Sequence, residues 1–368
     1  MRFTVKREPL LKALNVVSRA VPQKAEVPAL CNIKIVCSEK GIELIGSDKS
    51  LTIRSIVPYM IGEEEIVKNV HHGATLVNSS LIVNTIKYAK SEFIDFELID
   101  RSILKITSGD SVYKPITSKA EDYPDLDLEQ PENAFDVKCS EFARLVDSVA
   151  FAASNKDTRP ILMCVNLSAG NGTLTAVATD TARLARKRIM IDSTSTFSIN
   201  ILSRRLLEIV RAFENEEYVT FSCNAQKAVF VFGNTLITTT LSNGDYPSTD
   251  RVMPKNFNYY LEVNSKEFIE FLEQQAVYDQ HIKMTMSEGE VTLLSRSQTA
   301  GSATTPISTF QFSGEQIEVS FKAQFVMEAI KALNCEDVTF AMVGEMKPFV
   351  IRNVKDDSVD MLITALVR

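Results

Sequence analysis

The sequence predicts an α+β fold with antiparallel sheets, built from three copies of one unit. The segments "EDYPDLD", from Glu121, and "GDYPSTD", from Gly244, are both D-Y-P turns in stretches rich in Pro and Asp, which are typical of connectors. They divide the chain of 368 residues into three similar pieces, expected as domains at 1–124, 125–252 and 253–368. Regular alternation of parallel strands with helices is absent, which favours antiparallel sheets.

A short strand and an amphipathic helix open each piece. The helices carry a one-sided apolar stripe, as expected of a helix that packs on a sheet. Ser140 and Ser265 stand where N-caps are expected. The three stripes are Leu10, Leu14, Val17 and Val21; Phe142, Leu145, Val146 and Val149; and Phe268, Leu272 and Ala276.

Hairpins and a second helix complete each unit. Asn171-Gly172 is a strong turn signal, because both residues tolerate a positive φ. Asp48 and Asp180 end equivalent strands, so each is expected to cap a turn with its carboxylate rather than to act in catalysis. Three unrelated domains would not explain two helices and three hairpin segments that recur in phase. The second helices are expected within 79–91, 203–213 and 322–333, each before a strand, at 93–98, 218–223 and 337–342.

Composition and charge exclude several classes of protein. The chain is 45% hydrophobic and 24% charged, has no apolar run of membrane-spanning length and begins without a secretory signal, so a cytoplasmic globular protein is expected. Six scattered cysteines and three histidines offer no metal-ligand spacing, and no cofactor is predicted. The net charge of −7 argues against coating nucleic acid by charge neutralisation, but allows a basic surface confined to one side.

No sequence motif points to an enzyme. The chain has no P-loop, no G-x-G-x-x-G and no G-x-S-x-G, and His71-His72 is an isolated pair. We therefore predict a non-catalytic protein. The basic residues Arg186, Lys187 and Arg188 follow Asp180 on the next strand and are expected to be surface charge rather than a nucleic-acid site.

The whole chain resembles the bacterial β sliding clamps, the processivity subunits of DNA polymerase III. The similar blocks are "MRFTVKREPLLKALNVVSRAVPQKAEVPAL", "AFAASNKDTRPIL", "VATDTARLARKR", "DYPSTDRVMPKNF", "KAQFVMEAIKAL", "KPFVIR" and "MLITALVR", in the family's order and separations. The resemblance implies three clamp-type domains with sheets outside and two helices each inside, in a head-to-tail homodimer that forms a six-domain ring around duplex DNA. The polymerase III catalytic subunit, the clamp loader and other replication and repair proteins would dock through short peptides.

The resemblance also implies an apolar peptide pocket between the second and third domains. Each apolar residue in it could alternatively belong to an ordinary core. The family usually has Gly-His or Ser-His where this chain has Thr181-Ala182, a proline where it has Ala365 and a tyrosine where it has Phe325, which suggests a divergent clamp with altered client selectivity or a second copy. The pocket residues are Arg159, Leu162, Thr179, Thr181, Ala182, Arg183, Leu184, Pro247, Arg251, Val252, Phe325, Pro348, Leu362, Ile363, Thr364, Ala365 and Leu366.

A basic group on and near the helices is expected to face DNA if the family arrangement holds. The alternative is that these charges are ordinary solvated helix surface. Lys24 and Lys156 lie in loops that match each other between the first two repeats. The whole group is Lys12, Arg19, Lys24, Lys87, Lys90, Arg144, Lys156, Arg204, Arg205, Arg211 and Lys331.

The subunit interface is expected between an edge strand in "SVYKPIT" and the first helix of the third repeat. An exposed strand edge must be paired or covered, although packing within one domain would serve as well. Lys105 and Lys114 near the edge are opposite in sign to Glu270 and Glu273 on the helix. The interface residues are Tyr113, Pro115, Glu270, Glu273, Val277 and Tyr278.

A repeat protein that binds DNA or acts as a scaffold without encircling DNA remains the alternative function.

Overall fold

The computed structural model describes residues 1–156, 158–213 and 216–366. The chain forms two compact units: Met1–Cys139 with Glu208–Leu241, and Ser140–Leu207 with the residues from Ser242 onward. The middle part of the sequence is therefore shared between the two units. The predicted division into three domains did not anticipate this. No helix among the described residues is long and apolar enough to cross a membrane.

The first unit contains two large antiparallel sheets. One has the order β11 (Ser111–Tyr113), β10 (Ile103–Ser108), β9 (Phe93–Ile99), β1 (Arg2–Lys6) and β7 (Val67–His71). The other has the order β12 (Thr117–Ser118), β8 (Gly73–Asn78), β2 (Asn32–Ser38), β3 (Gly41–Ser47), β4 (Leu51–Val57), β20 (Thr235–Thr240), β19 (Lys227–Phe232), β18 (Tyr218–Cys223) and β13 (Phe135–Lys138). A small hairpin of β5 (Met60–Ile61) and β6 (Glu64–Glu65) accompanies them.

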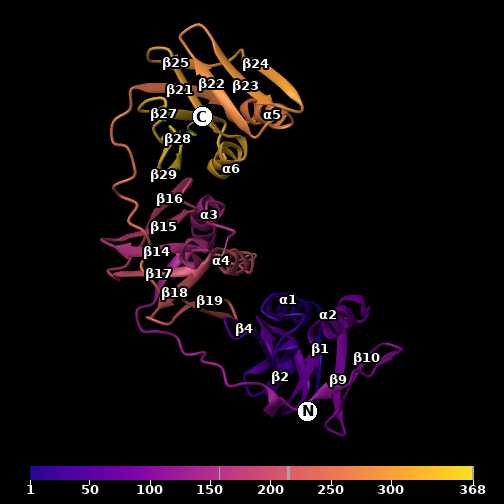
Figure 1. Cartoon of the computed structure of the whole chain (residues 1–368). Helices are drawn as coiled ribbons and strands as arrows, with labels where there is room; N and C mark the ends of the chain where they lie inside the picture. Colours follow the sequence, from indigo (N-terminus) through magenta and orange to yellow (C-terminus); the bar gives the residue numbers. More distant parts are fainter. Residues whose placement is uncertain (157, 214–215, 367–368) are drawn as a thin grey trace. The chain divides into compact units, whose positions relative to one another are not determined.

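Helices α1 (Arg7–Ser18) and α2 (Ser79–Tyr88) lie side by side in this unit (Figure 1). Leu10, Leu14 and Val17 are buried, as the apolar stripe predicted. At Gly46 on β3 the helix approaches so closely that a Cβ atom would lie 2.7 Å from the carbonyl oxygen of Val17. Only glycine fits at this contact between helix and sheet.

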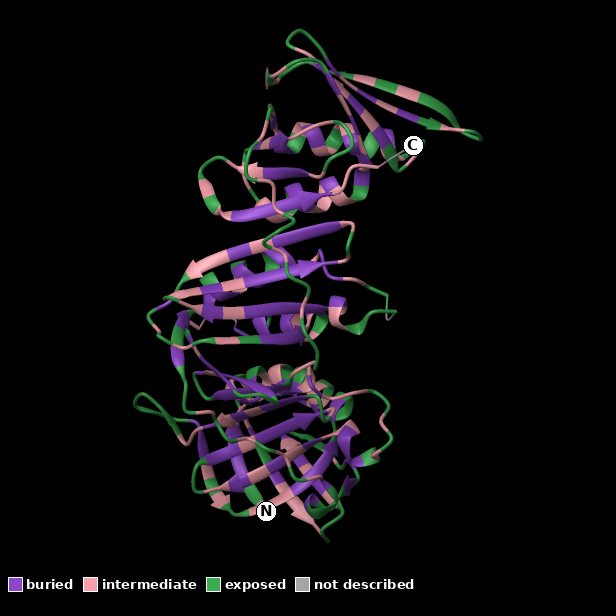
Figure 2. Ribbon diagram, turned by 60° about the vertical axis from the view of Figure 1, so that its left-hand side comes forward, coloured by how far each residue is buried: buried purple, intermediate pink, exposed green. Residues whose placement is uncertain are grey.

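The second unit also contains two sheets. The larger has the order β17 (Phe197–Leu202), β14 (Cys164–Gly170), β15 (Thr173–Thr179), β16 (Arg183–Met190), β29 (Asp356–Ile363), β28 (Phe349–Asn353), β27 (Asp337–Met342), β21 (Tyr259–Asn264) and β25 (Gln311–Ser313). The smaller has the order β24 (Gly301–Ile307), β23 (Val291–Ser297), β22 (His281–Met286) and β26 (Ile317–Lys322). Buried residues run along most of these strands (Figure 2), whereas the edge strands β24 and β25 consist mainly of exposed and intermediate residues.

The other four described helices also fall where the sequence predicts them. They are α3 (Cys139–Ala150), α4 (Ser203–Val210), α5 (Ser265–Ala276) and α6 (Ala323–Leu333). The two N-cap predictions were wrong. Asn264 caps α5 by accepting a hydrogen bond from the Glu267 backbone N–H, at 3.2 Å, and Ser140 lies inside the first turn of α3. In both cases the helix starts one or two residues earlier than the serine suggested.

The turn predictions are confirmed. Asn171 and Gly172 have φ values of 51° and 70°, as a tight hairpin turn requires. The Asp48 carboxylate accepts hydrogen bonds from the backbone N–H groups of Ser50 and Leu51, at 2.9 and 2.8 Å, and therefore caps its turn as expected.

Candidate functional site

A cavity of about 390 Å³ lies in the second unit, beside the second D-Y-P segment. Its walls come from the 159–162 segment, the end of β15, the start of β16, the 247–252 segment and the end of β29. The lining residues are Arg159, Ile161, Leu162, Thr179, Thr181, Arg183, Leu184, Pro247, Ser248, Thr249, Val252, Leu362 and Thr364. All of them except Ile161, Ser248 and Thr249 belong to the predicted pocket set.

Strand pairing brings the distant parts of this cavity together. In the β16–β29 ladder Leu184 stands opposite Leu362, and both are buried in one cluster with Val177 and Val350. Tyr246 of the D-Y-P segment packs against this cluster. Its hydroxyl accepts a hydrogen bond from the Thr179 backbone N–H, at 3.0 Å, and burial raises its pKa, so the proton is retained.

The turn at Asp180 shapes one rim of the cavity. The Asp180 carboxylate accepts hydrogen bonds from the backbone N–H groups of Ala182 and Arg183, both at 3.0 Å, which confirms the predicted turn-capping role. Thr181 is held at a φ of 80°, just as Lys49 at the equivalent place in the first repeat has a φ of 75°. A β-branched residue in this region is strained by about 1–3 kcal/mol. The rim is therefore a fixed and strained turn.

Arg183 ties this rim to α6. Its guanidinium donates to Asp180 at 3.1 Å and to the Phe151 carbonyl oxygen at 2.7 Å, and it forms a close ion pair with Glu328. It also lies 4.6 Å from the ring centroid of Phe325. Because these groups already pair with the guanidinium, Arg183 stabilises the rim of the cavity and does not provide an unpaired positive charge.

The prediction that Arg186, Lys187 and Arg188 are surface charge was wrong for Lys187, and Arg186 and Arg188 are half-buried. Lys187 is only 5% exposed and its ammonium donates to Asp356 at 2.9 Å. Arg186 and Arg188 both pair with Asp360, at 2.9 and 3.4 Å. The basic residues of β16 lie beside acidic residues of β29, which is about 170 residues away in sequence. The ion pairs between the two strands account for the run of basic residues.

The remaining predicted pocket residues do not line the cavity. Ala182 offers its carbonyl oxygen to the backbone N–H of Thr364, at 3.0 Å, and Ile363 is buried in the ladder. Phe325 lies under Arg183, Arg251 is exposed, and Pro348, Ala365 and Leu366 are half-buried. Ile161, Ser248 and Thr249 were not predicted to line the cavity, although all three lie within blocks that resemble the family.

The predicted DNA-facing residues lie on or beside helices and in two loops. Lys24, Lys87, Lys90, Arg144, Lys156, Arg204, Arg211 and Lys331 are exposed, as is Lys12, whereas Arg19 and Arg205 are half-buried. Several already have a carboxylate partner: Lys12 pairs with Glu216, Arg19 and Arg211 with Glu208, and Lys331 with Glu273.

The predicted interface residues divide between the two units. β11 is the edge of its sheet, as predicted, and Tyr113 on it is half-buried. Pro115 is buried within its own chain, whereas the neighbouring Val112 and Ile116 are 49% and 81% exposed. After α5, Val277 and Tyr278 are 80% and 40% exposed. Glu270 is exposed, and Glu273 and Lys105 already pair within the chain, with Lys331 and Glu97.

Two observations bear on chemistry at the cysteines and at metal-ligating groups. Burial raises the pKa of the Cys139 and Cys223 thiols to about 11, so both stay protonated and unreactive near neutral pH. Within residues 1–156, 158–213 and 216–366, no three His, Cys, Asp or Glu side chains are grouped so that they could hold a metal ion.

Three family models match consecutive parts of the chain. They describe the N-terminal, central and C-terminal domains of the DNA polymerase III beta subunit and match residues 1–127, 136–248 and 250–366. Among known proteins, the beta sliding clamp of Bacillus subtilis (strain 168) is 27% identical over 99% of this chain and 98% of its own length. The beta sliding clamp of Staphylococcus aureus (strain Mu50) is also 27% identical, with the same coverage.

Solved structures agree with these matches. The DNA polymerase sliding clamp of Bacillus subtilis superposes with a TM-score of 0.95 at 25% identity, over 100% of this chain and 99% of that one. The DNA polymerase III beta chain of Streptococcus pneumoniae superposes with a TM-score of 0.95 at 27% identity, over the full length of both. With three clamp domains that match along the whole sequence, the chain belongs to the DNA polymerase III beta subunit family of sliding clamps.

Proposed function

We propose that this chain is the non-catalytic, ring-forming clamp of a replicative DNA polymerase. Two copies join head to tail around duplex DNA, and the polymerase, the clamp loader and other clients dock on each copy through short peptides. The domains are 1–124, 125–252 and 253–368. The observation that carries the proposal is the preformed cavity beside Tyr246 in the second unit.

The cavity has the properties that a peptide anchor requires. Its volume of about 390 Å³ suits one or two large apolar side chains. Leu162, Leu184 and Leu362 supply apolar walls, and the fixed turn at Thr181 supplies a rigid rim. A preformed site requires little ordering when a ligand binds, so a short extended peptide can bind without the chain refolding.

Two exposed sheet edges support self-association. β11 ends the five-stranded sheet of the first unit, and β24 ends the four-stranded sheet of the second. Exposed apolar residues accompany both, with Ile116 near β11 and Val277 after α5, the helix that contacts β24. A contact between two different surfaces repeats head to tail, and it closes into a ring when the rotation permits.

A ring of two copies fits the number of helices. The six α-helices of the described residues give twelve in a dimer. Side by side at about 10 Å they trace a circle about 38 Å across, which leaves a hole of about 28 Å after subtracting a helix diameter of about 10 Å. Such a hole passes duplex DNA with a layer of water. Topology then retains the ring, so the net charge of −7 is compatible with DNA as partner.

Peptide titration tests the docking site. A fluorescent peptide with adjacent leucine- and phenylalanine-type anchors is expected to bind, and Val252→Asp is expected to weaken binding roughly 10- to 100-fold, because a carboxylate at the mouth must lose water. Val252 lines the cavity and is 48% exposed, so the fold should tolerate the change. Val354→Asp is the matched control, since Val354 is 72% exposed and does not line the cavity. Equal weakening by both variants would contradict docking at this site.

The same titration addresses client selectivity. Thr181, Ala182, Phe325 and Ala365 differ from the usual residues of the family, and Thr181 forms part of the cavity wall. We propose that this clamp serves an altered set of clients. A consensus clamp-binding peptide should therefore bind more weakly here than to an ordinary clamp. Equal affinities would remove the argument for altered selectivity.

A further inference from the structure

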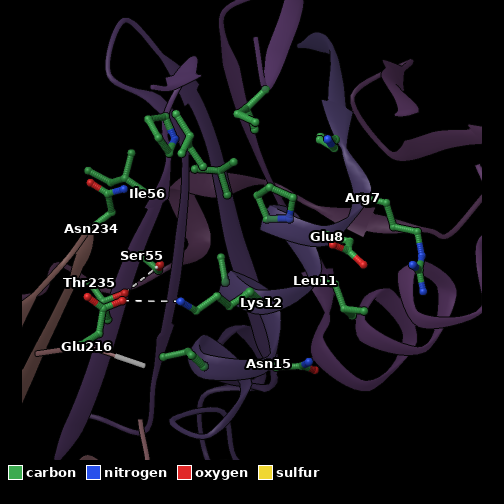
Figure 3. A pocket seen from close by; sticks show the side chains of 18 of the residues that line it. Arg7, Glu8, Leu11, Lys12, Asn15, Ser55, Ile56, Glu216, Asn234 and Thr235 are labelled. Carbon is green, nitrogen blue, oxygen red and sulfur yellow. Dashed lines mark hydrogen bonds and ion pairs between the residues drawn. The ribbon is translucent and has the colours of Figure 1, made fainter. Parts of the chain in front are cut away.

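Two carboxylates stand against three of the cations that are proposed to face DNA. Glu216 lies 3.5 Å from the Lys12 ammonium, and Glu208 lies 3.7 Å from the Arg19 guanidinium and 3.0 Å from that of Arg211. All five residues belong to the first unit. Figure 3 shows the Lys12 side chain extending toward Glu216. Both residues line a cleft of about 710 Å³, whose walls come from α1, β4, the 58–66 segment and parts of the 212–235 segment.

These ion pairs contribute little to folding. The side chains of Lys12 and Arg211 are 59% and 60% exposed, and those of Glu208 and Glu216 are 34% and 29% exposed. Ion pairs this accessible to water add little to stability, because water and salt screen their attraction. Their main physical effect is therefore on charge, because the two carboxylates offset two of the three positive charges among these five residues.

We propose that Glu208 and Glu216 limit how tightly the helix surface binds the phosphates of duplex DNA. The inference rests on the proposed function and on the expectation from the sequence that Lys12, Arg19 and Arg211 face the duplex. Each phosphate that a cation neutralises releases counterions, which adds about 0.9 to the slope of log affinity against log salt. A ring that is retained by topology does not need tight binding to the phosphates. Tight binding would also slow the movement of the ring along DNA. The carboxylates keep these cations near the duplex while competing with its phosphates.

The combined substitution Glu208→Gln and Glu216→Gln tests this role. Equilibrium binding of the unloaded full-length protein to a short linear duplex is measured over a range of salt concentrations. We expect the salt dependence to steepen by roughly two to three in slope and the affinity at low salt to rise roughly tenfold or more. Adding Lys12→Gln to this variant should reduce the slope again by about 0.9. Thermal melting checks that the variants remain folded.

A matched control separates a local effect from a change in net charge. Glu39 and Glu121 are exposed in the same unit, in the turn after β2 and in the 120–122 segment, and they form none of the three pairs. The variant with Glu39→Gln and Glu121→Gln changes the net charge equally and should leave the slope near that of the unsubstituted protein. A slope change of the same size in both variants, or none in either, would overturn the proposal.

The proposed function fails separately from this inference. If the unsubstituted protein, once loaded, is retained on circular DNA but the Glu208 and Glu216 variant shows no steeper salt dependence than its control, only the inference is wrong. If the unsubstituted protein is lost equally from circular and linear DNA, the ring itself is wrong and the inference with it.

Discussion

Replacing Asp360 by asparagine is expected to lower the free energy of unfolding by about 3 kcal/mol. The substitution removes a buried negative charge that pairs with several arginine side chains. Asp360 is 5% exposed, and its carboxylate lies 2.9 Å from Arg186, 3.4 Å from Arg188 and 3.3 Å from Arg352. Without it, three guanidinium groups would face one another with no central negative charge. Unfolding in urea, followed by circular dichroism, measures the change.

Asp250→Asn is the matched control for this substitution. Asp250 also pairs with Arg186, at 3.2 Å, but its side chain is 89% exposed, so its loss should lower stability by less than about 1 kcal/mol. Asp360 belongs to the β16–β29 ladder, and Leu184 and Leu362 of that ladder line the cavity. Asp360→Asn should therefore also weaken peptide binding, whereas Asp250→Asn should not. Equal losses of stability in the two variants would contradict the role assigned to the buried cluster.

The second large effect is expected at Val277. A carboxylate in Val277→Glu would have to be buried in the proposed subunit contact, and the dimer dissociation constant should rise roughly 100-fold or more. The fold itself should be unaffected, because this side chain is 80% exposed in the single chain. Analytical ultracentrifugation over a concentration series measures the change.

Val354→Glu introduces the same charge elsewhere in the third repeat. Val354 is 72% exposed in the tight turn between β28 and β29, outside the proposed contact, so this variant should associate like the unsubstituted chain. If Val277→Glu left association unchanged, or if both variants weakened it equally, the subunit contact would have to lie elsewhere on the surface.

Local patterns predicted the elements of the fold well. Apolar periodicity located all three first helices, and Phe142, Leu145 and Val146 on the second are fully buried. Turn chemistry located Asn171-Gly172 and the caps at Asp48 and Asp180. These features depend on residues a few positions apart, so the sequence carries them directly.

Features that depend on distant pairing were not predictable. Each nine-stranded sheet crosses a boundary between repeats, through β4–β20 and β16–β29. The hydroxyls of Ser55 and Thr235 meet at 3.0 Å although they are 180 positions apart in sequence. For the same reason the prediction of surface charge at Lys187 was wrong, since its partner Asp356 lies on a strand that only the folded chain brings near.

The site shows the same division. Resemblance to the family identified most of the residues that line the cavity. The roles of those residues came from the fold: Tyr246 is a packed anchor of its connector, and the charge of Arg183 is taken up by Asp180 and Glu328. A D-Y-P motif, which predicts a loop, therefore also marks a tyrosine that packs on a core cluster: Tyr246 is partly buried, and Tyr123 in the first connector is buried.

Retention on DNA of different topology tests the central claim most directly. The protein is loaded by a clamp loader onto nicked circular DNA and onto the same DNA made linear, and both are then washed at high salt. A ring that encircles DNA should stay on the circle and leave the linear form through its free ends, because salt weakens phosphate contacts but does not open a closed ring. Equal, salt-sensitive loss from both forms would contradict encirclement and favour a repeat protein that binds along one face of DNA.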